Sequence, residues 1–156
     1  MSTGTAHLHA IPGWETPELE LAVTARAENV CVVRHAIASL VTGTRLDDEA
    51  CADVILAVGE ACADAVVHAY QGTRPGKLEV RAQTRRRTLE IIVADHGHGM
   101  APRPDSPGLG LGLPLMASLS RSLELRPARG GGTEVWMTFD LPADGNGRGP
   151  RFARTG

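Results

Sequence analysis

The sequence predicts a two-layer α/β sandwich of the α+β type, with a mixed, mainly antiparallel sheet and helices on one face. Two observations support this class. Segments with helical spacing follow one another at Ala27 to Val41 and Leu46 to Tyr70, which predicts adjacent helices. The strand-like segments come in pairs joined by short turns, without the crossover helix that parallel neighbours need.

The N-terminal half accounts for one strand and both long helices. A strand is expected at residues 19–24, because Leu19, Leu21 and Val23 alternate with the residues between them. The first helix is expected to stop at Gly43. The second begins with acidic residues at 47–49, which suit the positive end of the helix dipole.

The C-terminal half alternates between strand patterns and segments rich in Gly and Pro. A short link between its first two strands predicts a hairpin, and a proline is well suited to the first turn of a helix. The expected elements are a turn at Gln71–Gly76, strands at Lys77–Gln83 and Thr88–Ala94, a loop at 96–112, a helix at Leu113–Ser120 with Pro114 in its first turn, and strands at Ser122–Arg126 and Glu134–Leu141.

The 156 residues are expected to form one domain, at residues 15–141. Residues 1–14 are small and polar, and residues 142–156 are rich in Gly, Pro and Arg, so both segments are expected to be flexible. A formal net charge of −2 gives no reason to expect a nucleic-acid partner.

The cellular compartment can be predicted from what the sequence lacks. No run approaches the ~18 apolar residues of a membrane span, and the N-terminus does not resemble a signal peptide. Cys31, Cys51 and Cys62 are an odd number without CxxC spacing, each beside apolar residues, so buried free thiols are expected. These features predict a cytoplasmic protein without membrane contact.

The second helix carries a polar stripe. Between Asp53 and Val67 its only charged residues are Asp53, Glu60 and Asp64, spaced so that all three share one face. One interpretation is a stripe that simply faces water. However, carboxylates one turn apart repel each other, and a hard cation such as Mg²⁺ between them would remove that repulsion.

Asp95 closes an apolar strand and is followed by Gly97 and Gly99. A carboxylate is costly to bury without a partner, and the exocyclic amine of adenine could supply the hydrogen bond. The glycines would let a flat ring lie close to the backbone. The alternative is a strand-end Asp in an ordinary turn, with glycines at positive φ.

A glycine cluster, Gly108 to Gly112, precedes the short helix. Backbone N–H groups at a helix N-terminus form an anion site that suits phosphates, whereas the alternative is a flexible loop. The spacing matches neither the dinucleotide fingerprint nor the Walker A loop. A metal site at His96 and His98 is less favoured, because no cluster of Cys or acids beyond Asp95 has zinc spacing.

The order of these motifs, with Gly132 and Thr133 before the last strand, resembles the GHKL ATP-binding fold of gyrase, heat-shock chaperone and histidine kinase ATPase domains. The segment 57–70 is similar to one branch, the anti-sigma-factor serine/threonine kinases of bacterial partner-switching systems. The resemblance spans residues 18–141.

The resemblance implies ATP and Mg²⁺ as cofactors and assigns roles to residues. Glu60 would act as general base toward a protein serine, Asp64 would bind Mg²⁺ and nucleotide, and Asp95 would bind adenine with Thr133 beside it. The residues expected to enclose the nucleotide are Gly97, Gly99, Met100, Gly108, Gly110, Leu111 and Gly112.

The chain departs from the family pattern at the phosphate end. Asp64 stands where relatives have an Mg²⁺-ligating Asn, and Val67 where many have Lys or Arg. The loop from Met100 to Pro107 is also short for a lid over the phosphates.

The resemblance implies a kinase that phosphorylates a serine of an anti-anti-sigma antagonist and binds a sigma factor. The competing function is a nucleotide-responsive module that sequesters a regulator without turnover. A histidine kinase is third, because no helix with a phosphoacceptor His precedes the ATP site. Relatives often form homodimers, so a homodimer is one expected state. Glu60 favours the kinase, whereas Asp64 and Val67 favour the binding module.

Overall fold

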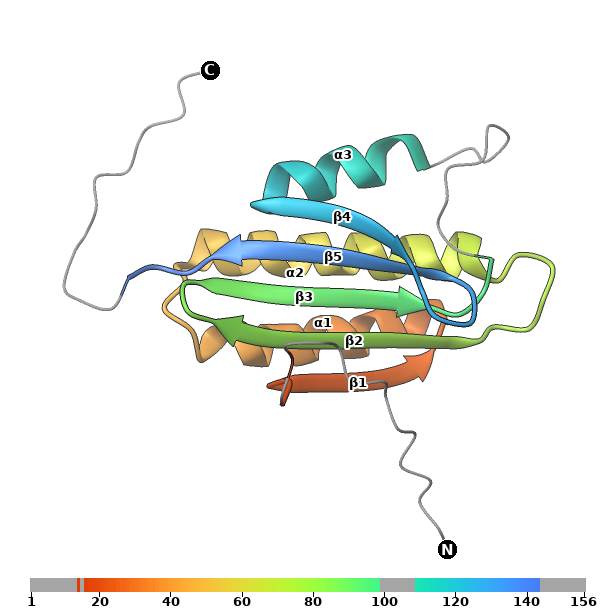
Figure 1. Cartoon of the computed structure of the whole chain (residues 1–156), viewed down its shortest axis with the longest axis horizontal. Helices are drawn as coiled ribbons and strands as arrows, with labels where there is room; N and C mark the ends of the chain where they lie inside the picture. The colour runs from red at the N-terminus through yellow and green to blue at the C-terminus, as the bar shows by residue number, and fades with distance from the viewer. Residues whose placement is uncertain (1–13, 15, 99–108, 144–156) are drawn as a thin grey trace, which may run out of the picture.

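The computed structural model (Figure 1) describes residues 14, 16–98 and 109–143, and of residues 109–111 only the backbone. Its five strands form one sheet in the order β1-β2-β3-β5-β4, and every neighbouring pair is antiparallel. The two-layer α+β prediction is therefore confirmed, although the described strands contain no parallel pair. The strands are β1 (Leu19–Thr24), β2 (Lys77–Arg85), β3 (Thr88–Asp95), β4 (Ser122–Pro127) and β5 (Thr133–Asp140).

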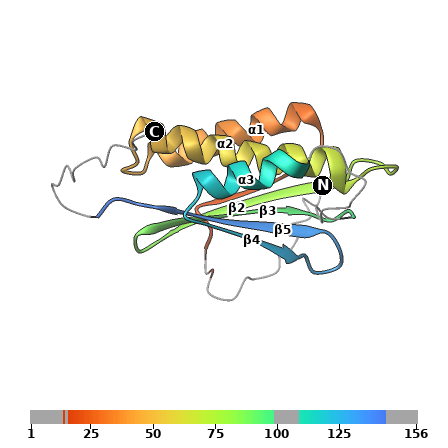
Figure 2. The same cartoon turned by 90° about the horizontal axis from the view of Figure 1, so that it is seen from above.

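All helices lie on one face of the sheet, as Figure 2 shows. Strand residues alternate so that one set points toward these helices, and the resulting core is almost entirely aliphatic because the chain has few aromatic residues. No helix among the described residues is long and apolar enough to cross a membrane. The helices are α1 (Ala27–Thr42), α2 (Asp48–Asp64), the π-helix η1 (Ala65–Ala69) and α3 (Leu109–Leu119).

The first helix begins and ends close to the predicted residues, and the second begins close to its predicted start. Asp47 caps α2 by accepting a hydrogen bond from the N–H of Ala50 at 2.8 Å, and Gly43 follows the end of α1. However, the second helix is not continuous to Tyr70. It widens into a π-helix after Asp64, a feature that occurs frequently at functional sites.

The helix α3 begins four residues earlier than predicted. The expectation placed Pro114 in the first turn, but Leu109 is the first helical residue and Pro114 lies in the interior. An interior proline removes one backbone hydrogen bond, which is why the rule on proline position predicted a later start. Packing on α2, with Met116 fully buried, offsets that loss.

Among the described residues, no helix lies on the opposite face of the sheet, but that face is partly covered. Trp14, at the end of the segment expected to be flexible, is only 8% exposed and packs edge-on against Trp136, with ring centroids 6.1 Å apart. The Arg126 guanidinium lies 4.0 Å above the Trp136 ring.

The cysteines are free, but Cys31 is exposed, contrary to expectation. Burial raises the pKa of Cys62 to about 12.

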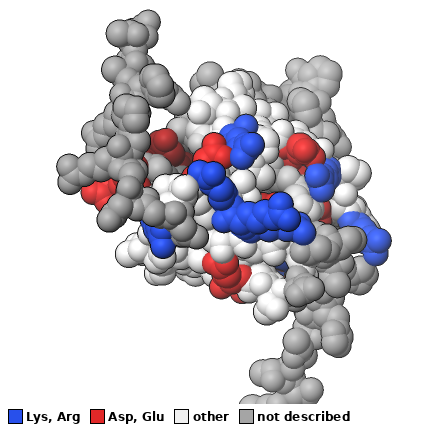
Figure 3. All heavy atoms as spheres, turned by 60° about the vertical axis from the view of Figure 1, so that its left-hand side comes forward, with Lys and Arg blue, Asp and Glu red and all other residues white. Residues whose placement is uncertain are grey.

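The sheet has a basic end and an end formed by Asp95. The tight β2–β3 hairpin carries exposed Arg85, Arg86 and Arg87, with Arg86 at φ 55°. Figure 3 shows basic side chains gathered at this end of the molecule. Because β3 runs from Thr88 to Asp95, the arginines and Asp95 lie at opposite ends of the same strand pair.

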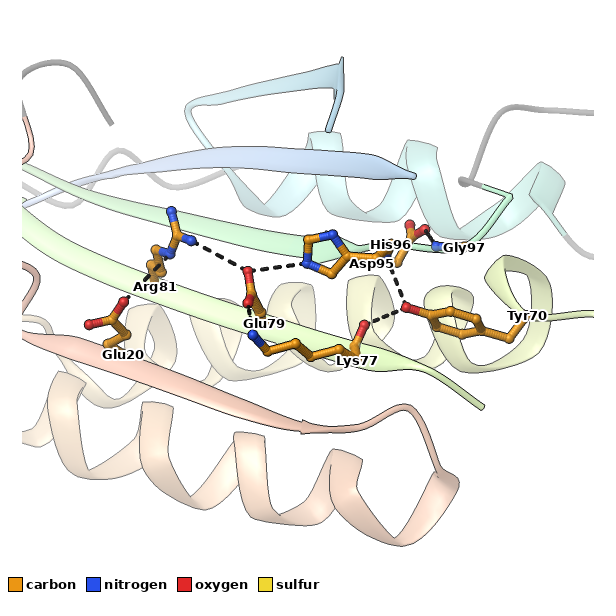
Figure 4. Close-up of polar contacts among 8 residues, drawn as sticks. All are labelled: Glu20, Tyr70, Lys77, Glu79, Arg81, Asp95, His96 and Gly97. Carbon is orange, nitrogen blue, oxygen red and sulfur yellow. Dashed lines mark hydrogen bonds and ion pairs between the residues drawn. The ribbon is translucent and has the colours of Figure 1, made fainter. Parts of the chain in front are cut away.

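Glu79 is the centre of a charged cluster on the sheet face opposite the helices, which we call the open face (Figure 4). Its side chain is 6% exposed and lies 2.5 Å from Lys77 Nζ, 3.3 Å from His96 Nε2 and 3.4 Å from an Arg81 nitrogen. Burial alone would raise the pKa of Glu79, but hydrogen bonds and charges from Lys77 and His96 outweigh it. The pKa of Glu79 is therefore lowered from its ordinary 4.5.

We predict that Glu79 makes the free energy of unfolding depend on pH. A lowered folded pKa stabilises the protein above the unfolded pKa of 4.5, and this stabilisation is lost as pH falls through the folded value. Glu79→Gln should therefore be less stable than wild type by about 1–3 kcal/mol at neutral pH. Urea unfolding should show this gap narrowing below pH 4.5.

The matched control is Glu124→Gln, whose carboxylate pairs with Arg126 but is 60% exposed. Solvent screens that pair, so its substitution should cost less than about 0.5 kcal/mol at any pH. A gap between wild type and Glu79→Gln that stays constant with pH would contradict the prediction.

We also predict unequal costs for two glycines in the β4–β5 turn. Gly130 (φ +82°) has open space where a Cβ would lie, so Gly130→Ala should cost about 1 kcal/mol of backbone strain. Gly132 (φ +95°) would place a Cβ 2.7 Å from the Asp95 carbonyl carbon. Gly132→Ala should lose about 2 kcal/mol more, because backbone must move. Urea unfolding of both variants measures the difference, and equal losses would disprove it.

Candidate functional site

Asp95 ends β3 with its side chain fully buried, on the face that the helices cover. It follows Leu89, Ile91 and Val93 in the alternation, and these residues belong to the core. Its Oδ1 accepts a hydrogen bond from the Gly97 N–H at 3.0 Å, which is the local turn that one interpretation of the sequence expected. The structure thus combines that turn with a carboxylate buried at a strand end, where burial is costly without polar partners.

Two glycines allow backbone segments to approach on both sides of Asp95. A Cβ on Gly97 would lie 2.8 Å from the Ala69 carbonyl carbon, and closer still to its oxygen. The His98 N–H donates to that same carbonyl oxygen at 2.6 Å. On the other side, Gly132 contacts the Asp95 backbone directly. The end of β3, the π-helix and the β4–β5 turn therefore meet at Asp95.

Thr133 lies next to Asp95, as the family resemblance implied. It is the first residue of β5 and is 9% exposed. The β3–β5 register ends at the pair Ala94 and Glu134, so Thr133 occupies the following position, opposite Asp95. Both side chains point toward the helices.

Glu60 and Asp64 lie one turn apart on α2, and both are partly exposed. Burial raises the pKa of the Asp64 carboxyl, the neighbouring charge of Glu60 raises it further, and His68 lowers it. Asp64 Oδ2 is itself buried and has no hydrogen-bond partner among the described residues. A buried oxygen without a partner is suited to a ligand that donates a hydrogen bond or carries positive charge.

The first turn of α3 packs directly on Asp64. A Cβ on Gly112 would lie 2.5 Å from Asp64 Oδ2, so only glycine leaves room for the carboxylate there. Gly110 and Leu111 belong to this first turn, where backbone N–H groups lack partners within the helix. The glycine cluster is thus helical at Gly110–Gly112, rather than a loop as predicted. Gly99, Met100 and Gly108 lie outside the described residues.

The donors present fit an Mg²⁺ ion shared with phosphate. Mg²⁺ uses one or two carboxylates and takes its other ligands from water and phosphates. Asp64 Oδ2 is such an oxygen, with the N-terminus of α3 beside it. Within the described part of the chain, no three His, Cys, Asp or Glu side chains form a metal-binding group. The His96 side chain instead pairs with Glu79 on the open face.

One residue at this site was not predicted from the sequence. Tyr70 places its hydroxyl between the start of β2 and the end of β3, where it bonds to both backbones (Figure 4). A single Tyr after a helix is normally assigned to the core, and its partners are known only from the fold. The one sequence signal was Gly76, where a Cβ would overlap the Tyr70 ring.

Comparison with protein families gives a match over most of the chain. The family model described as "Histidine kinase-like ATPase domain" matches residues 23–139. The serine-protein kinase RsbW of Bacillus licheniformis is 34% identical over 79 residues, which cover 51% of this chain and 49% of that protein. The chain thus spans about half the length of that relative.

A second curated relative is matched almost from end to end. The anti-sigma F factor of Clostridium acetobutylicum is 30% identical over 131 residues, which cover 77% of this chain and 91% of that protein.

Solved structures share the fold. A structure of the RsbU and RsbW domains of a Mycobacterium tuberculosis protein matches with a TM-score of 0.61 and 21% identity, over 81% of this chain and 33% of that one. A histidine kinase domain from Erythrobacter litoralis matches with a TM-score of 0.54 and 20% identity, over 76% of this chain and 62% of that one. At these identities the structures establish the fold alone.

The family model covers β2, β3, β4, nearly all of β5, both long helices and α3, and the Clostridium relative is covered over nearly its full length. The expected resemblance is therefore confirmed, and this chain belongs to the histidine kinase-like ATPase domain family.

Proposed function

We propose that this protein is an ATP- and Mg²⁺-dependent serine/threonine kinase of the anti-sigma type, which phosphorylates an anti-anti-sigma antagonist and binds a sigma factor. The observation that carries the proposal is the buried Asp64 Oδ2, without a partner among the described residues, against the first turn of α3. An unpaired acidic oxygen beside backbone N–H groups suits a metal-bound phosphate. Glu60, one turn away, supplies a base.

The two ends of the site would hold the two ends of ATP. Asp95, buried at the end of β3, would accept a hydrogen bond from the exocyclic amine of adenine, with Thr133 beside it. Gly97 would keep the backbone close to the ring. The N–H groups of the α3 first turn, at Gly110 to Gly112, would face the phosphates. Gly99, Met100 and Gly108, which lie outside the described residues, are also proposed to contact the nucleotide.

Phosphoryl transfer depends mainly on positioning and charge neutralisation. Bound ATP with Mg²⁺ would supply the transferable phosphoryl group and the neutralising charge. Asp64 would hold the metal through Oδ2. Glu60 would orient the partner's serine hydroxyl and accept its proton as the oxygen–phosphorus bond forms. The partner's serine thereby becomes a phosphoserine, and ADP is released.

The alternative is a nucleotide-responsive module that sequesters a sigma factor without turnover. Two observations favour it. Asp64 carries a negative charge at the position where relatives have a neutral Asn. Val67, which is 57% exposed, stands where many relatives have Lys or Arg. Both differences from the family pattern weaken the electrostatic attraction between the protein and a triphosphate. Under either function we propose a cytoplasmic protein without nucleic-acid or membrane partners, with a homodimer as one assembly state.

We predict that Glu60→Gln strongly slows phosphoryl transfer without abolishing nucleotide binding. Loss of a general base typically slows the reaction by about 10²–10⁴-fold, whereas ADP affinity should change by less than about threefold. Labelled ATP incubated with candidate antagonists measures transfer, and calorimetry with ADP measures binding.

Two results would change the assignment. Transfer that survives Glu60→Gln would remove Glu60 as the base. Clear ADP binding without transfer by wild type would favour the binding module. As a control, Asp53→Asn alters another acid on α2, distant along the helix, and should leave transfer unchanged.

We further predict that nucleotide binding depends steeply on Mg²⁺, because the Asp64 carboxylate repels phosphates unless a cation lies between them. Removing Mg²⁺ should weaken ADP binding by about 10-fold or more in wild type, and by a smaller factor in Asp64→Asn. Calorimetry with and without Mg²⁺ gives the four affinities. An equal Mg²⁺ effect in both proteins would refute a special role for the carboxylate charge.

A further inference from the structure

The Tyr70 hydroxyl joins two strand ends near the proposed adenine site. It donates a hydrogen bond to the Lys77 carbonyl at 2.5 Å and accepts one from the His96 N–H at 2.9 Å (Figure 4). Lys77 begins β2, and His96 directly follows the end of β3. Both partners are backbone groups, so the hydroxyl fixes the position of the chain itself, using its donor and an acceptor lone pair.

The Tyr70 ring fills the space beside the same segment. A Cβ on Gly97 would lie 2.9 Å from the ring atom Cδ1, and a Cβ on Gly76 would lie 2.7 Å from Cζ. The preceding residue, Ala69, accepts a hydrogen bond from the His98 N–H at 2.6 Å. Residues 96–98 therefore lie against the end of the π-helix, held by two hydrogen bonds and by ring packing.

The hydrogen bond between the Tyr70 hydroxyl and the His96 N–H is linked to the Asp95 carboxylate through Gly97. Asp95 Oδ1 accepts its hydrogen bond from the Gly97 N–H, and Gly97 directly follows His96. A shift of the His96 backbone would move Gly97 and change the direction of the carboxylate. The Asp95 backbone is itself held by pairing with Leu78 on β2. The Tyr70 hydroxyl therefore acts on the segment that follows Asp95, at His96 and Gly97.

The His96 side chain is held separately, on the open face. Its ring lies 3.3 Å from Glu79, which Lys77 and Arg81 also contact. The backbone of His96 is thus fixed from the helix side by Tyr70, and its side chain from the other side by Glu79. The two attachments can be tested independently, because one uses the backbone N–H and the other the imidazole.

We propose that the Tyr70 hydroxyl is a positioning group for the Asp95 carboxylate, and that it determines how strongly the site selects adenine over a purine without the exocyclic amine. The proposal rests on the adenine-binding role of Asp95 given above. A carboxylate that points toward the exocyclic amine raises the affinity for adenine. A carboxylate turned away from the amine raises that affinity less, although the ring can still enter the site.

The test measures the affinities of ADP and inosine diphosphate by calorimetry in the full chain. Inosine diphosphate has an oxygen in place of the amine. Wild type should prefer ADP by about tenfold or more, and Tyr70→Phe, which keeps the ring, should reduce that preference by about three- to tenfold. Its affinity for inosine diphosphate should stay near the wild-type value.

Two further variants separate the possible outcomes. Asp95→Asn should reduce the ADP preference to near one. Ser122→Ala removes another hydroxyl contact, with Thr138, from the far end of the sheet, and should leave the preference unchanged. Amide hydrogen exchange should be faster at His96 in Tyr70→Phe than in wild type, because that N–H loses its partner.

Three results would overturn the proposal. If Tyr70→Phe keeps the wild-type preference while Asp95→Asn loses it, Asp95 reads adenine but Tyr70 does not position it. If Tyr70→Phe weakens both nucleotides equally, the hydroxyl has a structural role only. If Asp95→Asn also keeps the preference, the adenine-binding role of Asp95 fails, and the positioning role fails with it.

Discussion

The arrangement around Asp95 depends on backbone segments that approach more closely than any side chain would permit. Gly97 lies against the carbonyl of Ala69, and Gly132 lies against the carbonyl of Asp95. These contacts bring the end of β3 to the end of α2 and η1 on one side, and to the start of β5 on the other. The buried carboxylate is positioned by this constraint, so its direction is a property of three separate parts of the chain.

Asp95 and Asp64, the acidic groups at the two ends of the site, have different electrostatic surroundings. Asp95 lies at a strand end, where a backbone N–H already engages one oxygen. Asp64 lies on a helix, beside another acid, with one buried oxygen that lacks a hydrogen-bond partner among the described residues. Under the proposed function, Asp95 would accept a directional hydrogen bond from the base, and Asp64 would hold a cation. This difference agrees with a ligand that is flat and polar at one end and highly charged at the other.

The π-helix connects these two ends. Asp64 is the last α-helical residue of α2, and Ala69, the last residue of η1, provides the carbonyl that receives His98. A wider turn between them changes the direction in which the following residues point, and Tyr70 then reaches both β2 and β3. A continuous α-helix, as the periodicity predicted, would place Tyr70 differently relative to the strand ends.

Local patterns in the sequence determined the layers, the strand pairs, and the stripe that carries Glu60 and Asp64, because alternation and helical spacing depend on near neighbours. They also placed Asp95 at a strand end, whereas the position of Thr133 beside it was implied by the family resemblance. Only the tertiary structure decided the early start of α3, the burial of Trp14, the charged cluster at Glu79 and the hydrogen bonds of Tyr70. Each of these depends on residues distant in the chain, whose packing and hydrogen bonds offset local preferences such as the position of Pro114.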